Sequence, residues 1–173
     1  MIFILVGYMA SGKSTLGRVL AEKLIYNFLD LDDYIESQEQ MSISEIFKTK
    51  GEIYFRKAET KYLKELLEGK TNLILSLGGG TPCYGNNMQL ILDATNAKSL
   101  YLKASIPTLV NRLKNEKGKR PLVAHIKTDE ELSEFIGKHL FERSPFYSQA
   151  NIVLPTDNKT TSEIIDELLS KLF

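Results

Sequence analysis

The amino-acid sequence predicts a three-layered α/β fold, in which helices cover both faces of a parallel sheet. Three observations lead to this prediction. Short apolar runs alternate with stretches of helical periodicity along the whole chain. The first apolar run leads directly into a glycine-rich loop and then a helical pattern. The chain has 173 residues and shows no internal repeat, so we expect one domain, 1–173.

Composition restricts the class of protein. The hydrophobic share of 43% and the charged share of 25% are ordinary for a globular protein. Lys and Arg together number 22, as do Asp and Glu, so no overall field attracts nucleic acid or an anionic membrane. The lone Cys83 excludes an internal disulfide and a cysteine-rich metal site. The apolar N-terminal run is too short for a signal sequence, and we expect a cytoplasmic monomer that binds neither nucleic acid nor a membrane.

The predicted elements begin with residues 2–6, a β-branched-rich run typical of a strand buried on both faces. Leu16, Leu20 and Leu24 then recur at helical spacing. Further apolar runs predict strands at 28–29, 73–77, 99–102 and 152–154. Helical patterns predict helices at 13–24, 32–39, 44–49, 52–67, 87–94, 107–115, 129–146 and 161–172. Thr128 and Thr160 each stand three residues before a glutamate, the spacing of a capping box, at the start of the last two helices.

Residues 7–14 read GYMASGKS, a complete G-x-x-x-x-G-K-[ST] phosphate-binding loop between the first strand and the first helix. This order aims successive backbone N–H groups at one point, beside the positive end of the helix dipole. Lys13 can reach the β- and γ-phosphates of a nucleotide, and the Ser14 hydroxyl can hold Mg²⁺. A chance match on a flexible turn is the alternative, and the flanking elements argue against it. The predicted ATP contacts of this loop are Gly7, Ala10, Ser11, Gly12, Lys13, Ser14 and Thr15.

Residues 115–127 form a long basic segment with a glycine, a proline and no sustained periodicity. A loop of this length inside a compact domain is usually functional or disordered. In a phosphate-binding protein, such a segment suggests a mobile lid that closes over the nucleotide and excludes water. The alternative is a solvated run of charges.

Asp30 and Asp32 directly follow the second strand candidate, and alternation places them on the same side of an extended chain. A phosphoryl transferase needs one carboxylate near Mg²⁺ and another to orient or deprotonate the acceptor hydroxyl. The alternative is an acidic helix N-terminus, with Asp32 or Asp33 as the cap. The sequence contains neither the Asn-Lys-x-Asp nor the Asp-x-x-Gly of GTPases. These features favour a small-molecule kinase.

Three glycines, Gly78, Gly79 and Gly80, follow a strand candidate at the end where parallel strands usually bind ligands. Arg56 lies in a helical stretch, where pairing with a surface acid is the ordinary fate of an arginine. Arg143 lies near the end of another helix, just before Pro145, which we expect to stop that helix.

Taken together, these motifs resemble the shikimate kinase family, and the resemblance covers nearly the whole chain. The motifs are the phosphate loop, Asp-x-Asp (Asp30, Asp32), Phe-Arg-x-x-Glu (Phe55, Arg56, Glu59), Gly-Gly-Gly (78–80), Arg-Pro-Leu (Arg120, Pro121, Leu122) and Arg-x-Pro-x-Tyr (Arg143, Pro145, Tyr147). The resemblance implies a five-stranded parallel sheet of the P-loop, nucleoside-monophosphate-kinase type. It also implies ATP-dependent phosphorylation of the 3-hydroxyl of shikimate to shikimate 3-phosphate and ADP, a step of aromatic amino acid biosynthesis.

The resemblance also implies roles for residues that bind shikimate. Asp32 would contact the acceptor hydroxyl, and Arg56 and Arg143 would hold the carboxylate. Gly78, Gly79 and Gly80 would present their backbone to the substrate. Two arginine forks suit this task because they orient a carboxylate as well as attract it.

On the nucleotide side, the resemblance places Asp30 near the water shell of Mg²⁺ together with Ser14. Lys13 and Arg120 would act on the transferring phosphate, and Arg112 would contact the adenine. In the family, a basic, proline-containing loop after the last strand also holds the adenine. This chain has neither arginine nor proline at 156–160, so adenine contacts there fall to residues 157–159. The alternatives are a related kinase of gluconate or a nucleotide, and a non-catalytic module that has kept the fold.

Overall fold

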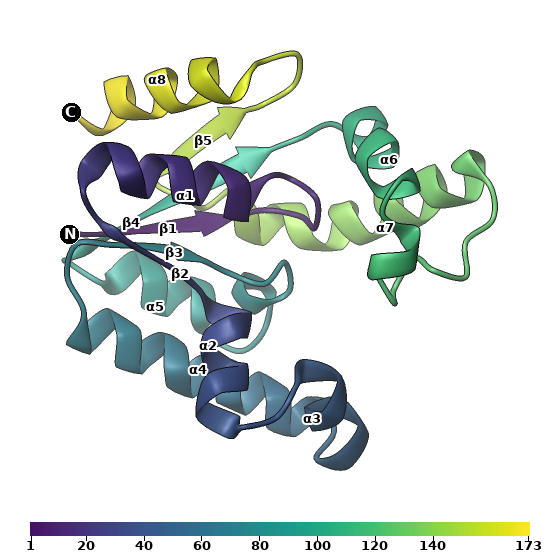
Figure 1. Cartoon of the computed structure of the whole chain (residues 1–173), viewed down its shortest axis with the longest axis horizontal. Coiled ribbons are helices and arrows are strands. Elements are labelled where there is room, and N and C mark those ends of the chain that lie inside the picture. The colour runs from purple at the N-terminus through teal and green to yellow at the C-terminus, as the bar shows by residue number, and fades with distance from the viewer.

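Five parallel strands form one sheet, as the sequence predicts. The structure is a computed structural model that describes residues 1–173, the side chain of Lys117 excepted. The strands are β1 (Ile2–Val6), β2 (Asn27–Asp30), β3 (Leu73–Ser76), β4 (Ala97–Lys103) and β5 (Ile152–Pro155). Their spatial order is β2-β3-β1-β4-β5, so the buried β1 lies at the centre (Figure 1).

Helices cover both faces of this sheet, which confirms the three-layered prediction (Figure 1). The helices are α1 (Lys13–Leu24), α2 (Leu31–Glu39), α3 (Ile43–Thr49), α4 (Glu52–Gly69), α5 (Asn87–Asp93), α6 (Ile106–Lys114), α7 (Asp129–Tyr147) and α8 (Thr161–Leu172). Phe3 and Leu5 of β1 pack in the core beneath α1 and α8. Ile4 and Val6 pack in the core on the opposite face, with α4, α5 and α7. None of the described helices is long and apolar enough to cross a membrane.

The carboxyl ends of β1, β2 and β3 lie side by side because these strands are neighbours in the sheet. The phosphate loop follows β1, the acidic segment follows β2, and the glycine triplet follows β3. Asp30 and Ser76 are register partners at the ends of β2 and β3. Three motifs that are distant in the sequence therefore meet at one edge of the sheet, as expected for ligand sites in parallel α/β folds.

The expectation that Pro145 stops α7 is wrong. The helix continues through the proline and ends at Tyr147, one residue beyond the predicted range 129–146. Proline removes one helical hydrogen bond, the one to the carbonyl of Phe141, and Phe141 is 84% exposed, so water can satisfy that carbonyl. Tyr147 is fully buried, and its hydroxyl donates a hydrogen bond to the Gly79 carbonyl. Tertiary packing of the last turn therefore outweighs the local cost of the proline.

Candidate active site

The phosphate loop connects the end of β1 to the start of α1. Gly12 ends the loop with a φ of 93°, a left-handed conformation that favours glycine, and α1 begins at the next residue. The Lys13 side chain curls back into the loop, where its Nζ donates to the carbonyls of Gly7 at 2.9 Å and Tyr8 at 3.0 Å. Burial is the main cause that lowers the Lys13 pKa, to about 8. A buried ammonium group held only by neutral carbonyls is well suited to an anionic ligand.

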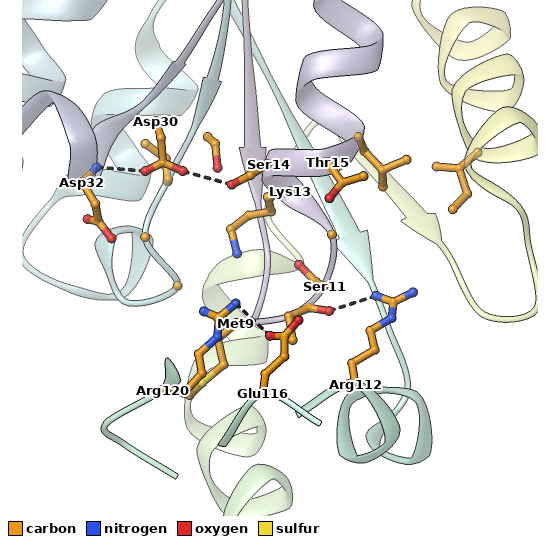
Figure 2. A pocket seen from close by; sticks show the side chains of 18 of the residues that line it. Met9, Ser11, Lys13, Ser14, Thr15, Asp30, Asp32, Arg112, Glu116 and Arg120 are labelled. Atoms are coloured by element: carbon orange, nitrogen blue, oxygen red, sulfur yellow. Dashed lines mark hydrogen bonds and ion pairs between the residues drawn. The ribbon is translucent and has the colours of Figure 1, made fainter. Parts of the chain in front are cut away.

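Ser14 and Asp30, the two residues predicted to bind a metal ion, lie within hydrogen-bond distance of each other. The Ser14 hydroxyl donates to Asp30 Oδ2 at 3.1 Å, and Asp30 Oδ1 accepts from the backbone N–H of Asp32 at 3.0 Å (Figure 2). Asp30 therefore caps α2, and the alternative that Asp32 or Asp33 provides the cap is wrong. The Asp32 side chain is left available for chemistry.

The Asp32 carboxylate lies in a cavity of about 400 Å³ beside the phosphate loop. Its neighbours in the lining include Lys13, Ser14 and Gly78. A β-carbon at Gly78 would lie 3.1 Å from Asp32 Oδ1, so the glycine leaves room beside the carboxylate. Burial, followed by the negative charges of Asp30 and Glu59, raises the Asp32 pKa from 3.8 to about 7. A carboxyl group with this pKa can accept a proton near neutral pH.

Two guanidinium groups converge on the glycine triplet from different helices. A β-carbon at Gly80 would lie 2.9 Å from Nη1 of Arg56, which is on α4, and 3.4 Å from Nη2 of Arg143, which is on α7. A β-carbon at Gly79 would lie 3.1 Å from Arg143 Nη1. Gly79 also lines the cavity that contains Asp32, so the arginine pair adjoins that cavity. Two cations gathered at one point form a site for an anion such as a carboxylate.

Glu59 has a supporting role that the sequence motif alone did not reveal. The residue is 1% exposed, and its carboxylate accepts from Arg56 Nη1 at 2.8 Å and from the Thr81 hydroxyl at 2.6 Å. The Thr81 carbonyl accepts in turn from the Asn87 side chain at 2.9 Å. These hydrogen bonds connect the segment after the glycine triplet to α4, and they hold Nη1 of the Arg56 guanidinium group in place. The available signal was the spacing of three residues between Arg56 and Glu59, which places them on one helix face.

Tyr8 and His139 are a further pair that sequence reasoning missed. The Tyr8 hydroxyl and His139 Nδ1 lie 2.9 Å apart, and the contact joins the phosphate loop to α7. Burial raises the Tyr8 pKa to about 12. Arg143 lies one turn after His139 on α7. The contact therefore connects the phosphate loop to the helix that carries Arg143. Because it joins segments that are distant in the sequence, no local pattern could indicate it.

The predicted lid segment contributes two charged side chains to the cavity. Arg120 Nη2 lies 3.3 Å from Glu116 Oε2, and both residues line the cavity opposite Lys13 (Figure 2). Within the same segment, Val123 and Ile126 are buried. This burial disagrees with the alternative of a purely solvated charge run and ties the segment to the core.

The predicted adenine contacts lie at the other end of the cavity. Arg112 lines it and donates from Nη1 to the Ala10 carbonyl at 2.9 Å (Figure 2). Lys159 also lines it, with its Nζ 2.6 Å from Glu167 Oε2. Asp157 instead accepts from the backbone N–H of Ser105 at 3.0 Å and is engaged at the start of α6. Of residues 157–159, Lys159 is the one placed at the cavity.

The chain is similar to known proteins over nearly its whole length. The family model described as Shikimate kinase matches residues 9–173. A shikimate kinase of Flavobacterium johnsoniae is 49% identical over 169 residues, which is 98% of this chain and 97% of the relative. The crystal structure of shikimate kinase from Bacteroides thetaiotaomicron has a TM-score of 0.89 at 35% identity and covers 99% of this chain and 98% of its own. A shikimate kinase from Acinetobacter baumannii in complex with shikimate has a TM-score of 0.84 at 30% identity, with coverages of 99% and 92%.

Proposed function

The chain belongs to the shikimate kinase family, and we propose that its site transfers the γ-phosphoryl group of ATP to the 3-hydroxyl of shikimate. The products are shikimate 3-phosphate and ADP, and the reaction serves aromatic amino acid biosynthesis. The observation that carries this proposal is the convergence of Arg56 and Arg143 on the glycine triplet. A small hydroxy acid bound there by its carboxylate can extend a hydroxyl toward Asp32 and the phosphate loop, which share the neighbouring cavity.

The nucleotide is bound at its phosphates by the loop after β1. Backbone N–H groups at the start of α1 surround the phosphates, and Lys13 exchanges its carbonyl partners for phosphate oxygens. Arg120 faces the same space from the lid segment and exchanges Glu116 for the transferring phosphoryl group. Phosphoryl transfer depends mainly on positioning and on neutralising charge, and these two cations supply both.

Mg²⁺ fits the pair formed by Ser14 and Asp30. Hydroxyl and carboxylate oxygens are the hard donors that this ion prefers, and the two side chains already touch at 3.1 Å. Mg²⁺ keeps several waters and takes few protein ligands, so Ser14 would bind it directly and Asp30 would hold its water shell. When bound, the ion neutralises negative charge on the phosphates.

Asp32 orients the acceptor hydroxyl and takes its proton. As the hydroxyl oxygen forms its bond to the γ-phosphorus, the bond between that phosphorus and the β,γ-bridging oxygen breaks and ADP departs. The proton moves from the hydroxyl to Asp32, whose pKa of about 7 suits a general base at neutral pH. In a loose transition state the proton moves late, so orientation of the hydroxyl contributes as well.

A panel of acceptors tests this function. ADP release from ATP, measured by a coupled assay, is compared for shikimate, gluconate and nucleoside monophosphates. We expect shikimate to be preferred by a large factor in kcat/KM. Preference for gluconate or a nucleotide would assign the site to a related kinase, because such kinases share the loop and the sheet. Absence of any ADP release would indicate a non-catalytic module.

We also propose that the protein acts as a cytoplasmic monomer. All of the side chains that the reaction uses come from one chain, and ATP is an abundant co-substrate in the cytoplasm. Sedimentation at working concentrations tests the monomer: a mass of about 19.6 kDa is expected. A mass of about twice this value would contradict it.

A further inference from the structure

An aromatic ring covers the guanidinium group of Arg56. The Arg56 Cζ atom lies 3.8 Å from the centroid of the Tyr84 ring, close enough for stacking of the planar cation on the ring face. Tyr84 directly follows the short 3-10 helix η1 (Thr81–Cys83), which itself follows the glycine triplet. The same short segment therefore shapes the floor of the predicted carboxylate site and covers the arginine.

The polar contacts of Arg56 do not fix its plane by themselves. Nη1 is held by Glu59 at 2.8 Å. Nε lies 3.6 Å from Glu52 Oε1, and it has no hydrogen bond to any residue that the structure describes. The covalent bond from Cδ to Nε and the single hydrogen bond at Nη1 hold the guanidinium group at two points, so its plane can still turn about the line between them. Contact with a ring face removes this freedom, because a stacked guanidinium group must keep its plane near that of the ring.

We propose that Tyr84 is a positioning residue, which holds the guanidinium plane of Arg56 toward the carboxylate of shikimate and so sets the affinity for this acid. The inference rests on the proposed function. A bidentate arginine–carboxylate pair requires both groups in one plane, so the orientation of Arg56 governs whether it can form. The Tyr84 ring, 38% exposed, lies at the edge of the site and keeps bulk water from one face of the cation.

The ring face performs this role, and the hydroxyl does not contribute. No residue that the structure describes forms a hydrogen bond with the Tyr84 hydroxyl, and the side chain is partly exposed. Tyr84→Phe therefore retains the function, whereas Tyr84→Leu keeps an apolar side chain of moderate size and loses the π face. Tyr54→Leu is a matched control, because Tyr54 is 37% exposed and its ring faces the ammonium group of Lys50 instead of Arg56.

The test measures shikimate binding by calorimetry together with steady-state kinetics. For Tyr84→Leu we expect the shikimate Kd and KM to rise about 3- to 10-fold, the affinity equivalent of a partly exposed cation–π contact. We expect kcat and the KM for ATP to change less than about twofold. Tyr84→Phe should stay within about twofold of the wild type in all of these constants, and Tyr54→Leu should leave the shikimate KM unchanged even if it lowers the melting temperature.

A double-mutant cycle shows whether Tyr84 acts through Arg56. Lysine has no guanidinium plane to align, so Tyr84→Leu should change shikimate affinity by less than about twofold in an Arg56→Lys background. Proton NMR gives a readout that does not require turnover. The Arg56 Hε resonance should show an upfield ring-current shift that persists in Tyr84→Phe and disappears in Tyr84→Leu.

Several results would overturn the role of Tyr84. These are an unchanged shikimate affinity in Tyr84→Leu, an equal loss in Tyr84→Phe, a parallel loss of ATP affinity, or full additivity with Arg56→Lys. The failure of the proposed function looks different, because the wild-type protein would then bind no shikimate. Normal wild-type binding with an unaffected Tyr84→Leu variant rejects the role of Tyr84 alone.

Discussion

Replacing Asp32 by asparagine should stabilise the folded protein at neutral and alkaline pH. The Asp32 pKa rises from 3.8 to about 7 on folding, so the folded state disfavours the ionised carboxylate. The unfolded state binds fewer protons than the folded state between these two values. This group therefore lowers stability as pH rises from about 4 to 7, and the full penalty is present above pH 7. Asparagine carries no charge at any pH and escapes the penalty.

The magnitude follows from the pKa shift. A rise from 3.8 to about 7 is about three units, and at about 1.4 kcal/mol per unit the upper figure is about 4 kcal/mol. Asp32 is only partly buried, so water screens some of this cost, and we expect a gain of about 1–3 kcal/mol at pH 8.

Urea unfolding of the wild type and Asp32→Asn at pH 8 and at pH 4 measures this gain. The gain should be present at pH 8 and be largely lost at pH 4, because there the folded wild type is protonated at Asp32 and the unfolded chain is only about half ionised at this residue. Asp166→Asn, at an exposed position on α8, is the control and should change stability by less than about 0.5 kcal/mol at either pH. A loss of stability at pH 8, or an equal gain at both pH values, would refute the electrostatic reasoning.

Three further predictions concern binding and transfer. Lys13→Ala or Arg120→Ala should lower kcat by about 10²–10³-fold with little change in shikimate affinity. Each substitution removes a hydrogen-bond donor to the transferring phosphate, and the loss of one such donor raises the activation barrier by about 2.7–4 kcal/mol. A normal kcat in steady-state kinetics would exclude that residue from phosphate stabilisation. Arg56→Lys or Arg143→Lys should weaken shikimate binding but not ATP binding, since the charge remains and the fork is lost; equal affinity by calorimetry would reject the carboxylate assignment. Ser14→Ala should raise the Mg²⁺ concentration needed for half-maximal activity, and an unchanged Mg²⁺ titration would remove Ser14 from the metal site.

Local sequence patterns predicted the helices and strands because the local preferences of the residues agree with the elements that they form. The buried strand β1, the loop after it and α1 follow from composition and glycine placement within the first 24 residues. Several predicted bounds differ from the observed ones by one or two residues, and two of these differences have a clear physical cause. The buried Tyr147 keeps α7 helical beyond Pro145, which is an effect of tertiary packing. The hydrogen bond from the Asp32 backbone N–H to the Asp30 side chain starts α2 at Leu31, one residue earlier than predicted, and periodicity does not report such a cap.

The site was predictable at residues that belong to motifs and not at those that support them. Asp30 and Asp32 were both identified, yet only the structure shows that Asp30 is the cap. The contacts of Tyr84 with Arg56, and of Tyr8 with His139, join segments far apart in the chain. Supporting contacts of this kind depend on how elements pack, so a single sequence carries no local signal for them.

The most direct test of the proposed mechanism is the turnover of shikimate by Asp32→Asn at saturating ATP and shikimate. Asparagine is nearly isosteric with aspartate and can still hydrogen-bond the hydroxyl, but it cannot accept the proton. We expect this variant to fold, to bind both substrates and to turn over about 10²–10⁴-fold more slowly than the wild type, which is the usual contribution of a positioned general base. Wild-type turnover in this variant would contradict the assignment of Asp32 as the residue that activates the acceptor hydroxyl.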